Sequence, residues 1–252
     1  MALDMSKYTV KTAKPMPVIL LLDVSGSMAG SSIDELNSAV SEMLKSFTRI
    51  EVMLQISIIT FGNEVKLIMQ QQEARDALNN WQDLDASGMT PLGTALRMAK
   101  DMVEDKEIVP SRSYRPLVVL VSDGEPTDDW RTPLQEFIST GRSQKSDRMA
   151  MGIGVDFNRD ILSQFIDGSS QPEVFTAEDA SQIKDFFKMV TMSVTRSTTV
   201  GGRKPDSSSA PAPSGDNRAT ATKAATTQSQ PHSQESPASK NDPQSTFEDY
   251  FG

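Results

Sequence analysis

Short apolar runs recur through most of this sequence, and segments with helical periodicity separate them. Residues 18–22 and 117–121 are entirely apolar, which is typical of strands that are buried on both faces. Between such runs, in residues 33–47 and 92–103, apolar side chains return every three or four positions, as on one face of a helix. Strands of this kind in alternation with helices predict a doubly wound α/β domain with a mostly parallel sheet.

The other elements follow from the same patterns. Further strands are predicted at residues 53–61, 65–68, 149–155 and 173–175, and further helices at 73–80, 133–140, 159–165 and 183–194. The Gly62-Asn63 turn predicts that residues 65–68 return as an antiparallel edge strand. Ser32 and Glu35 have the spacing of a capping box, which predicts the start of the first helix.

The composition changes abruptly after Arg196. Residues 197–252 contain one Val, no Leu, Ile or Met, six Pro, ten Ser and seven Thr. Such a segment buries too little apolar surface to offset the entropy of ordering it. We therefore expect an N-terminal extension (1–13), a folded domain (14–196) and a low-complexity disordered tail (197–252). The tail ends in an aromatic and acidic motif, residues 246–252.

Two counts and the net charge exclude several classes of function. The chain has no Cys, and its single histidine, His232, lies in the expected tail. Catalysis by Ser-His-Asp or by a thiolate, and zinc sites built from His or Cys, are therefore excluded from the folded domain. With 25 Lys and Arg against 34 Asp and Glu, the net charge is −9, which disfavours binding to nucleic acid or anionic membranes. The chain lacks a sufficiently long apolar segment and an apolar start, so we expect no membrane span, no secretory signal and a cytoplasmic location.

Oxygen-bearing side chains gather after the predicted strands. Asp23, Ser25 and Ser27 follow the first buried strand, Asp123 follows the central one, and Thr90 precedes a helix that starts at Pro91. The carboxyl ends of parallel strands share one edge of the sheet, so these side chains are expected to meet there. Such ligands suit Mg²⁺, with Mn²⁺ or Ca²⁺ as alternatives. Only two of the five are carboxylates, so the cation is expected to bind a further carboxylate from a protein partner.

The pattern Asp-x-Ser-x-Ser at residues 23–27, with Thr90 and Asp123, resembles the metal-ion-dependent adhesion site (MIDAS) of von Willebrand factor type A (VWA) domains. This resemblance implies a doubly wound, Rossmann-like fold and a Mg²⁺ ion held by the hydroxyls, with the aspartates acting partly through water. It also implies that a Glu or Asp of the partner completes the coordination shell. A narrower resemblance, to bacterial TerY-like proteins of tellurite-resistance and stress-response clusters, rests on residues 17–28, 58–61, 88–93 and 120–130. That narrower likeness implies association with a protein kinase and a PP2C-type phosphatase.

Three functions remain open at this stage. The first is a non-enzymatic, Mg²⁺-dependent protein-interaction module. The second is a metal-dependent phosphohydrolase or phosphotransferase with Asp23 as a phosphate acceptor, although the chain has no phosphate-binding Gly-x-x-x-x-Gly-Lys-Ser/Thr loop. The third is a scaffold that acts mainly through its tail.

Several residues beside the predicted metal loops also have two interpretations. Asp128 and Asp129 are either further ligands or part of an ordinary acidic turn before a helix. Met28 and Met89 flank the loops and are candidates for the docking surface. Trp130 is either a contact for a partner or a cover for the sheet. Asp156 either supports the same crevice or begins the turn to Arg159.

Overall fold

The computed structural model describes residues 14–155, 157–179 and 181–200. Residues 1–13 and 201–252 lie outside this part, and the second of these ranges contains most of the expected tail. In chain order the elements are β1 (Met16–Asp23), η2 (Gly26–Met28), α1 (Ser31–Phe47), β2 (Leu54–Phe61), β3 (Val65–Gln72), α2 (Ala74–Asn80), α3 (Leu92–Glu104), β4 (Leu117–Ser122), α4 (Arg131–Ser139), η3 (Ser143–Lys145), β5 (Asp147–Ile153), α5 (Arg159–Ile166), β6 (Val174–Ala177) and α6 (Ser181–Val200).

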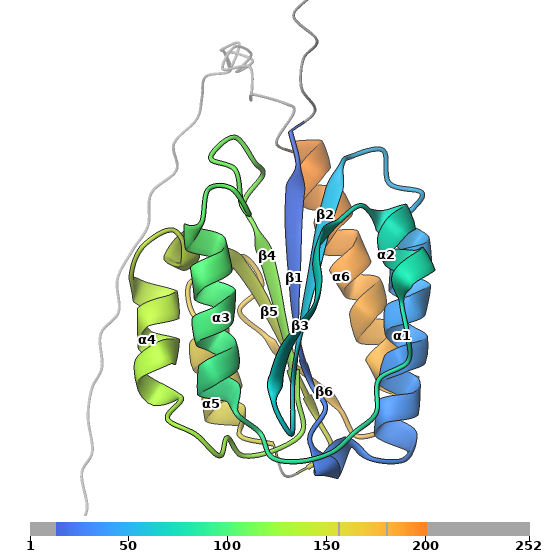
Figure 1. The fold of residues 1–252 in the computed structure, drawn as a ribbon, viewed down its shortest axis with the longest axis vertical. Helices are drawn as coiled ribbons and strands as arrows, with labels where there is room; N and C mark the ends of the chain where they lie inside the picture. Colours follow the sequence, from blue (N-terminus) through green and yellow to red (C-terminus); the bar gives the residue numbers. More distant parts are fainter. Residues whose placement is uncertain (1–13, 156, 180, 201–252) are drawn as a thin grey trace, which may run out of the picture. The chain divides into compact units, whose positions relative to one another are not determined.

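The six strands form one sheet in the order β3-β2-β1-β4-β5-β6 (Figure 1). Every neighbouring pair is parallel except β2 and β3, which pair antiparallel. The predicted doubly wound sheet with one antiparallel edge strand is therefore confirmed. Asp23 lies opposite Phe61 of β2, and Leu22 lies opposite Val121 of β4. This register brings the ends of the two central strands to the same level at one edge of the sheet.

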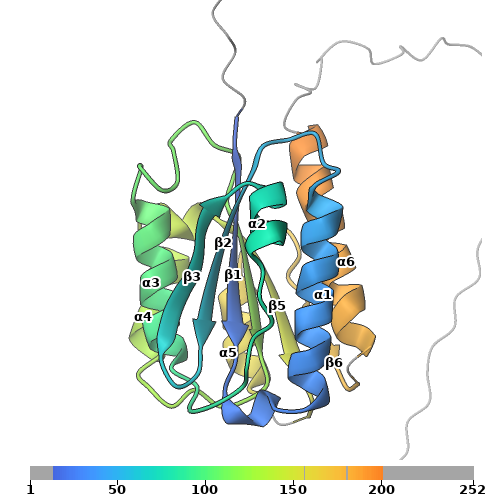
Figure 2. The ribbon, with the colours of Figure 1, turned by 45° about the vertical axis from the view of Figure 1, so that its right-hand side comes forward.

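Helices cover both faces of the sheet, as Figure 2 shows with α1 and α6 on one side and α3 and α4 on the other. Alternate residues of β1 point to opposite faces. Leu20 packs in the cluster that includes residues of α1, α2 and α6, whereas Leu21 packs in the cluster that includes residues of α3, α4 and α5. Each such burial contributes about 1.5–3 kcal/mol. The two covered faces explain why the central strands are apolar at successive positions.

The structure corrects two local predictions. The capping box is wrong: α1 begins at Ser31, its N-cap is Gly30, and no side chain caps it. The strand predicted at residues 149–155 begins earlier than expected, because β5 includes Asp147 and Arg148. Arg148 is only 2% exposed, and its guanidinium donates to backbone carbonyls, including those of Phe165 (2.6 Å) and Ser146 (3.0 Å). These bonds allow a charged residue inside a buried strand, which hydropathy does not reveal.

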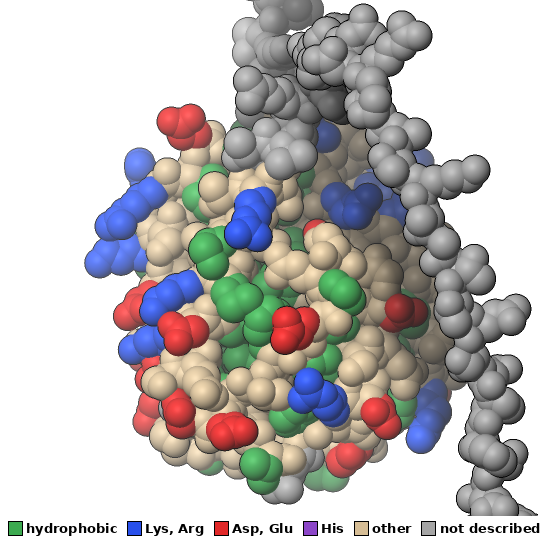
Figure 3. Space-filling view, turned by 180° about the vertical axis from the view of Figure 1, so that it is seen from behind, with side chains coloured by type: hydrophobic (Ala, Val, Ile, Leu, Met, Phe, Trp, Pro, Cys, Tyr) green, Lys and Arg blue, Asp and Glu red, His purple; other side chains and the backbone are tan. Residues whose placement is uncertain are grey.

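The edge strand β6 has only four residues. Figure 3 shows the opposite side of the molecule from Figure 1, where hydrophobic side chains gather between charged ones. Beside β6 a groove is lined in part by Phe175, Met189 and Met192. A short edge strand offers little unpaired backbone to another chain.

In the described residues, no helix combines the length and the hydrophobicity that a membrane span requires.

Candidate metal site

Asp23 forms the base of the candidate site, at the carboxyl end of β1. Its side chain is fully buried, and each carboxylate oxygen accepts one hydrogen bond. Ser122 Oγ donates to Oδ2 (2.6 Å), and the backbone N–H of Ser25 donates to Oδ1 (2.9 Å). Sequence reasoning missed Ser122; the available signal is a hydroxyl residue that ends an otherwise apolar strand. These two bonds fix the orientation of the Asp23 carboxylate.

Ser25, Ser27 and Asp123 lie together above this base. Ser27 Oγ donates to Asp123 Oδ1 (2.8 Å), and Ser25 Oγ lies 3.4 Å from the same oxygen and 3.0 Å from Ser27 Oγ. The short helix η2 starts after Ser25, and its Gly26 N–H donates to Gly88 O (3.0 Å). The loop after β1 is thereby joined both to the loop after β4 and to the loop that leads to Thr90.

Thr90 is held by its backbone. Its N–H donates to Thr127 Oγ1 (3.1 Å), and its carbonyl accepts from Thr127 N–H (2.9 Å). A Cβ atom added to Gly124 would lie 3.9 Å from Thr90 Oγ1 and 3.8 Å from Ser27 Oγ. The two hydroxyls therefore border the same small space, which the missing side chain of Gly124 leaves free. Four of the expected residues are linked by hydrogen bonds, and Thr90 faces the space beside them.

Asp128 caps helix α3. Its two carboxylate oxygens accept from Gly93 N–H and Thr94 N–H, both at 2.8 Å, and Oδ2 also accepts from Thr94 Oγ1 (2.8 Å). Such a carboxylate satisfies free N–H groups and interacts favourably with the helix dipole. Asp128 thus binds the first turn of α3 and not the helix α4 that follows it in sequence, whose N-cap Trp130 makes no side-chain cap bond. Asp129 is exposed, 3.8 Å from Arg97.

Burial decreases from the base of the site to its rim. Asp23, Ser25 and Thr90 are buried, Asp123 is half-buried, and Ser27 is exposed. Burial raises the pKa of Asp23 to about 6, although the hydrogen bonds from Ser122 and Ser25 oppose this shift. Burial also raises the pKa of Asp123, against the hydrogen bonds from Ser27 and Ser25. The site thus holds two carboxylates whose charge is poorly compensated by the protein alone.

The five side chains fit a small, hard cation. All donor atoms are oxygens, and the hydroxyls of Ser27 and Thr90 border the space that a Cβ of Gly124 would enter. A positive charge in the site would relieve the desolvation of Asp23. In the described part of the chain, no three Asp, Glu, His or Cys side chains come together as a metal cluster. A cation here therefore depends on the hydroxyls of Ser25, Ser27 and Thr90.

The neighbouring residues divide between surface and core. Met89 is 63% exposed beside Thr90, as expected for a docking surface, but the same expectation for Met28 is wrong, because that side chain is fully buried. Trp130 is half-buried against the α3 face of the core, and Arg131 lies 4.6 Å from its ring. Asp156 lies outside the described residues.

Residues 18–189 match the model of the von Willebrand factor type A domain. The chain belongs to the VWA family. Curated relatives include inter alpha-trypsin inhibitor heavy chain 4 of Mus musculus, 25% identical over 187 residues, which covers 69% of this chain and 19% of the relative. An uncharacterized protein of Synechocystis is 24% identical, over 70% of this chain and 41% of its own length. The chain thus spans less than half of each of these relatives.

Solved VWA structures share the fold at low sequence identity. A von Willebrand factor type A protein from Catenulispora acidiphila aligns with a TM-score of 0.60 and 17% identity, over 73% of this chain and 43% of its own. Proximal thread matrix protein 1 from the mussel byssus, described with a zinc-occupied MIDAS motif, aligns with a TM-score of 0.59 and 21% identity. That alignment covers 71% of this chain and 48% of the mussel protein.

Replacing Thr127 by Val is expected to loosen the Thr90 segment. The variant keeps the side-chain volume but removes the oxygen that accepts Thr90 N–H, and an unpaired buried donor costs about 1–3 kcal/mol. Urea denaturation should show this loss, whereas Thr127→Ser retains the oxygen and should unfold like the parent protein. Equal stability of the Val and Ser variants would show that the bond does not hold Thr90.

Proposed function

We propose that this VWA domain is a metal-dependent protein-interaction module, in which Asp23, Ser25, Ser27, Thr90 and Asp123 hold a divalent cation. The observation that carries the proposal is the convergence of two carboxylates and three hydroxyls at the carboxyl edge of the sheet. VWA domains form a family of interaction and adhesion modules. A bound cation would supply an electrophilic centre for an oxygen ligand from outside the domain.

Mg²⁺ is the proposed ion. It prefers oxygen ligands in a compact set with retained water, whereas Ca²⁺ favours six to eight oxygens and Mn²⁺ accepts similar donors. The zinc-occupied MIDAS motif of the mussel protein supports divalent binding in this fold. Because the five proposed ligands include neither nitrogen nor sulfur, we expect no preference for zinc of the kind that His and Cys create.

The proposed partner supplies a Glu or Asp to the metal. Three of the five ligands are neutral hydroxyls, so an added carboxylate would improve charge compensation. The exposed rim at Ser27 and the exposed Met89 leave room for this contact. Met89 would then pack against apolar atoms next to the partner's carboxylate.

The proposed setting is a bacterial stress-response or defence assembly in the cytoplasm, with a protein kinase and a PP2C-type phosphatase as partners. The sequence resemblance to TerY-like proteins supports this setting, including its link to tellurite resistance. We propose no catalytic activity, because residues 14–196 contain no His, no Cys and no Gly-x-x-x-x-Gly-Lys-Ser/Thr loop to bind nucleotide phosphates. Nucleic acid and membranes are not proposed as partners. A scaffold role for the tail is compatible with this function.

A pull-down with the full chain as bait tests the proposal. Capture of the candidate kinase and phosphatase should require Mg²⁺, should stop in EDTA and should be lost in Asp123→Ala. The matched control is Asp129→Ala, because Asp129 is exposed and pairs only weakly with Arg97, 3.8 Å away. Capture that persists in EDTA and in Asp123→Ala would refute metal-dependent docking.

The affinity for Mg²⁺ is expected to fall as the pH falls below about 6. The cation requires ionised Asp23, whose pKa is raised to about 6 by burial, so below that pH a proton must be displaced. The apparent affinity should then drop by roughly tenfold per pH unit, and should change little between pH 7 and 8. Calorimetric titrations from pH 5 to 8 check this. An affinity that is independent of pH would exclude Asp23 as a ligand.

A further inference from the structure

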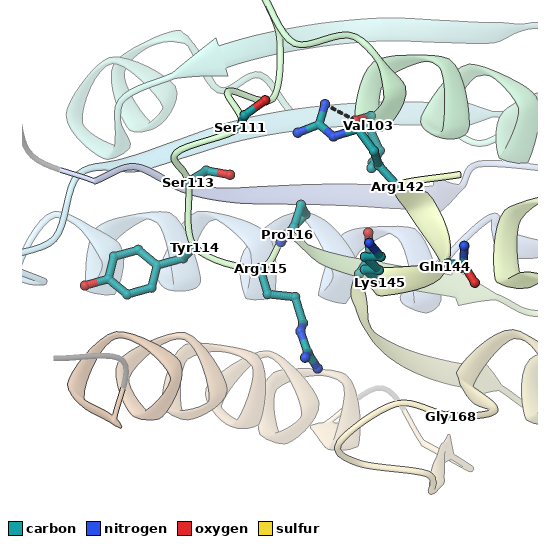
Figure 4. Close-up of a pocket in the computed structure, with 11 residues that line it drawn as sticks. Val103, Ser111, Ser113, Tyr114, Arg115, Pro116, Arg142, Gln144, Lys145 and Gly168 are labelled. Atoms are coloured by element: carbon teal, nitrogen blue, oxygen red, sulfur yellow. Dashed lines mark hydrogen bonds between the residues drawn. The ribbon is translucent and has the colours of Figure 1, made fainter. Parts of the chain in front are cut away.

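The opposite edge of the sheet, where β4 and β5 begin, contains a second candidate site. A cavity of about 520 Å³ opens there, between the segment before β4 and the turn that contains η3 (Figure 4). Ser111, Ser113 and Arg115 line it from the first segment, and Arg142 and Lys145 line it from the second. None of the lining residues is an Asp or Glu.

The cations of this cavity lack acidic partners. In the described residues, neither Arg115 nor Lys145 has a carboxylate within 4.0 Å of its charged nitrogens. Both side chains belong to exposed residues. The guanidinium of Arg142 donates hydrogen bonds to the carbonyl oxygens of Val103 (2.8 Å) and Val109 (2.6 Å). These bonds fix the position of the charge but do not neutralise it. The side chains that line the cavity thus carry positive charge, whereas the chain as a whole has a net charge of −9.

The nearby acids are already engaged. Asp147 interacts with Arg115 at longer range, but its oxygens accept hydrogen bonds from Ser169 Oγ (2.8 Å) and Ser170 Oγ (2.6 Å), which hold its pKa below the usual value despite burial. Glu104 accepts from the backbone N–H of Arg142 (2.7 Å). Among the described residues, the Arg148 guanidinium donates hydrogen bonds to backbone carbonyls only, and it interacts with Asp147 and Asp167 at longer range. It lies 3.8 Å from where a Cβ of Gly168 would be. The cavity lining itself therefore carries three cationic side chains and no acidic one, with Asp147 and Glu104 outside the lining.

A buried hydroxyl in the cavity wall is unpaired. Ser146 is 3% exposed, its Oγ has no hydrogen-bond partner in the described part of the chain, and the residue lines the cavity. A buried polar atom without a partner destabilises the folded state, so such atoms are rare unless a ligand or water satisfies them. This observation is independent of the charges, and it indicates a ligand that accepts hydrogen bonds.

We propose that this cavity binds the phosphoryl group of a phosphate monoester. The group carries a charge of about −1.5 to −2 at neutral pH and three acceptor oxygens, which match the cations of Arg115 and Lys145 and the hydroxyl of Ser146. Arg binds such a group through paired N–H donors, and Lys binds it as a point charge. A free phosphorylated metabolite and a phosphorylated Ser side chain of a protein present the same group. This site is separate from the metal site and does not depend on the proposed function.

Calorimetric titration of the full chain tests the proposal, with inorganic phosphate and N-acetyl-phosphoserine amide as probes at constant ionic strength. We expect saturable binding that Arg115→Gln and Lys145→Gln each weaken at least tenfold. Lys66→Gln is the matched control, since Lys66 is exposed and pairs with Glu64 (2.6 Å) on β3. Tighter binding of the phosphoserine probe would favour a protein side chain as the source, and tighter binding of inorganic phosphate would favour a small ligand.

The variant Ser146→Ala separates binding from folding. Because Ser146 Oγ has no partner, its removal should leave the free energy of unfolding unchanged or raise it, while it weakens the binding of phosphate. Lack of saturation with both probes, or equal binding by the parent protein, Arg115→Gln and Lys145→Gln, would overturn the proposal. Unchanged binding in Ser146→Ala would remove that hydroxyl from the site.

Discussion

An Asp23→Asn variant is expected to be more stable than the parent protein in EDTA and to lose the stabilisation that Mg²⁺ gives the parent protein. Asp23 is fully buried, and burial raises its pKa from 3.8 to about 6. A carboxyl whose pKa is higher in the folded state destabilises that state once it ionises. The penalty is fully present above pH 6 and disappears as the pH falls toward 4. At pH 7 this shift corresponds to about 3 kcal/mol.

Asn preserves the local geometry while it removes the charge. Its Oδ1 still accepts from Ser25 N–H, and its amide donates to Ser122 Oγ, which turns to accept. In EDTA the variant should gain about 1–3 kcal/mol in the free energy of unfolding. In Mg²⁺ at one hundred times its dissociation constant, the parent protein should gain about 2.7 kcal/mol and the variant almost nothing, because it has lost one of two charged ligands.

Urea denaturation at pH 7, in EDTA and in Mg²⁺, measures both effects. Asp129→Asn is the control, because its exposed carboxylate lies outside the bonded cluster. It should unfold like the parent protein in both buffers. If Asp23→Asn is destabilised in EDTA and still stabilised by Mg²⁺, Asp23 is a structural residue and the metal site lies elsewhere.

The fold was predictable because its sequence signals are local. The apolar run of residues 18–22 indicates a strand covered on both faces, and the Gly62-Asn63 turn indicates the antiparallel return to β3. The signals failed where tertiary contacts decide the outcome. Arg148 enters β5 because its guanidinium donates hydrogen bonds to backbone carbonyls, including that of Phe165 in α5. Helix α1 begins at Ser31 after the N-cap Gly30, without the side-chain cap that Ser32 and Glu35 suggested.

The residues of the candidate site could be predicted from the sequence, but the hydrogen bonds that hold them in place could not. Asp23 and Asp123 stand directly after apolar strands, so their meeting at one edge follows from parallel topology. The bonds that orient the site join residues far apart in sequence: Ser122 binds Asp23, and Thr127 binds Thr90. Both are ordinary polar residues, and only the folded chain shows what they contact. The cavity proposed to bind a phosphoryl group could not be predicted from the sequence for the same reason, since Arg115 and Lys145 come from separate segments.

A Gly88→Ala variant is expected to lose at least about 3 kcal/mol of stability. Gly88 has a φ of +84°, which costs an L-residue about 1–2 kcal/mol. Its added Cβ would lie 2.4 Å from Asn63 Cα and 2.5 Å from Asn63 N. These are backbone atoms of the turn between β2 and β3, so the overlap is relieved only if this turn or the loop that contains Gly88 moves. The cost of that movement adds to the cost of the backbone conformation.

Gly154→Ala is the matched control for Gly88→Ala. Gly154 also has a positive φ, +76°, but a Cβ there would meet no atom within 4 Å. It should lose only about 1–2 kcal/mol, from backbone strain alone. The difference between the two variants in urea denaturation therefore measures the steric overlap with Asn63. Equal losses would mean that the loops adjust freely.

The same movement is expected to weaken the metal site. Gly88 O accepts the N–H of Gly26, between Ser25 and Ser27, so a shift of Gly88 displaces these hydroxyls relative to Thr90. In Gly88→Ala the affinity for Mg²⁺ should fall at least tenfold, whereas Gly154→Ala should bind like the parent protein. Calorimetric titration of both variants tests this at a temperature where each remains folded. Loss of stability with unchanged affinity would show that the backbone bond between Gly26 and Gly88 does not align the ligands, and that Thr90 is positioned by Thr127 alone.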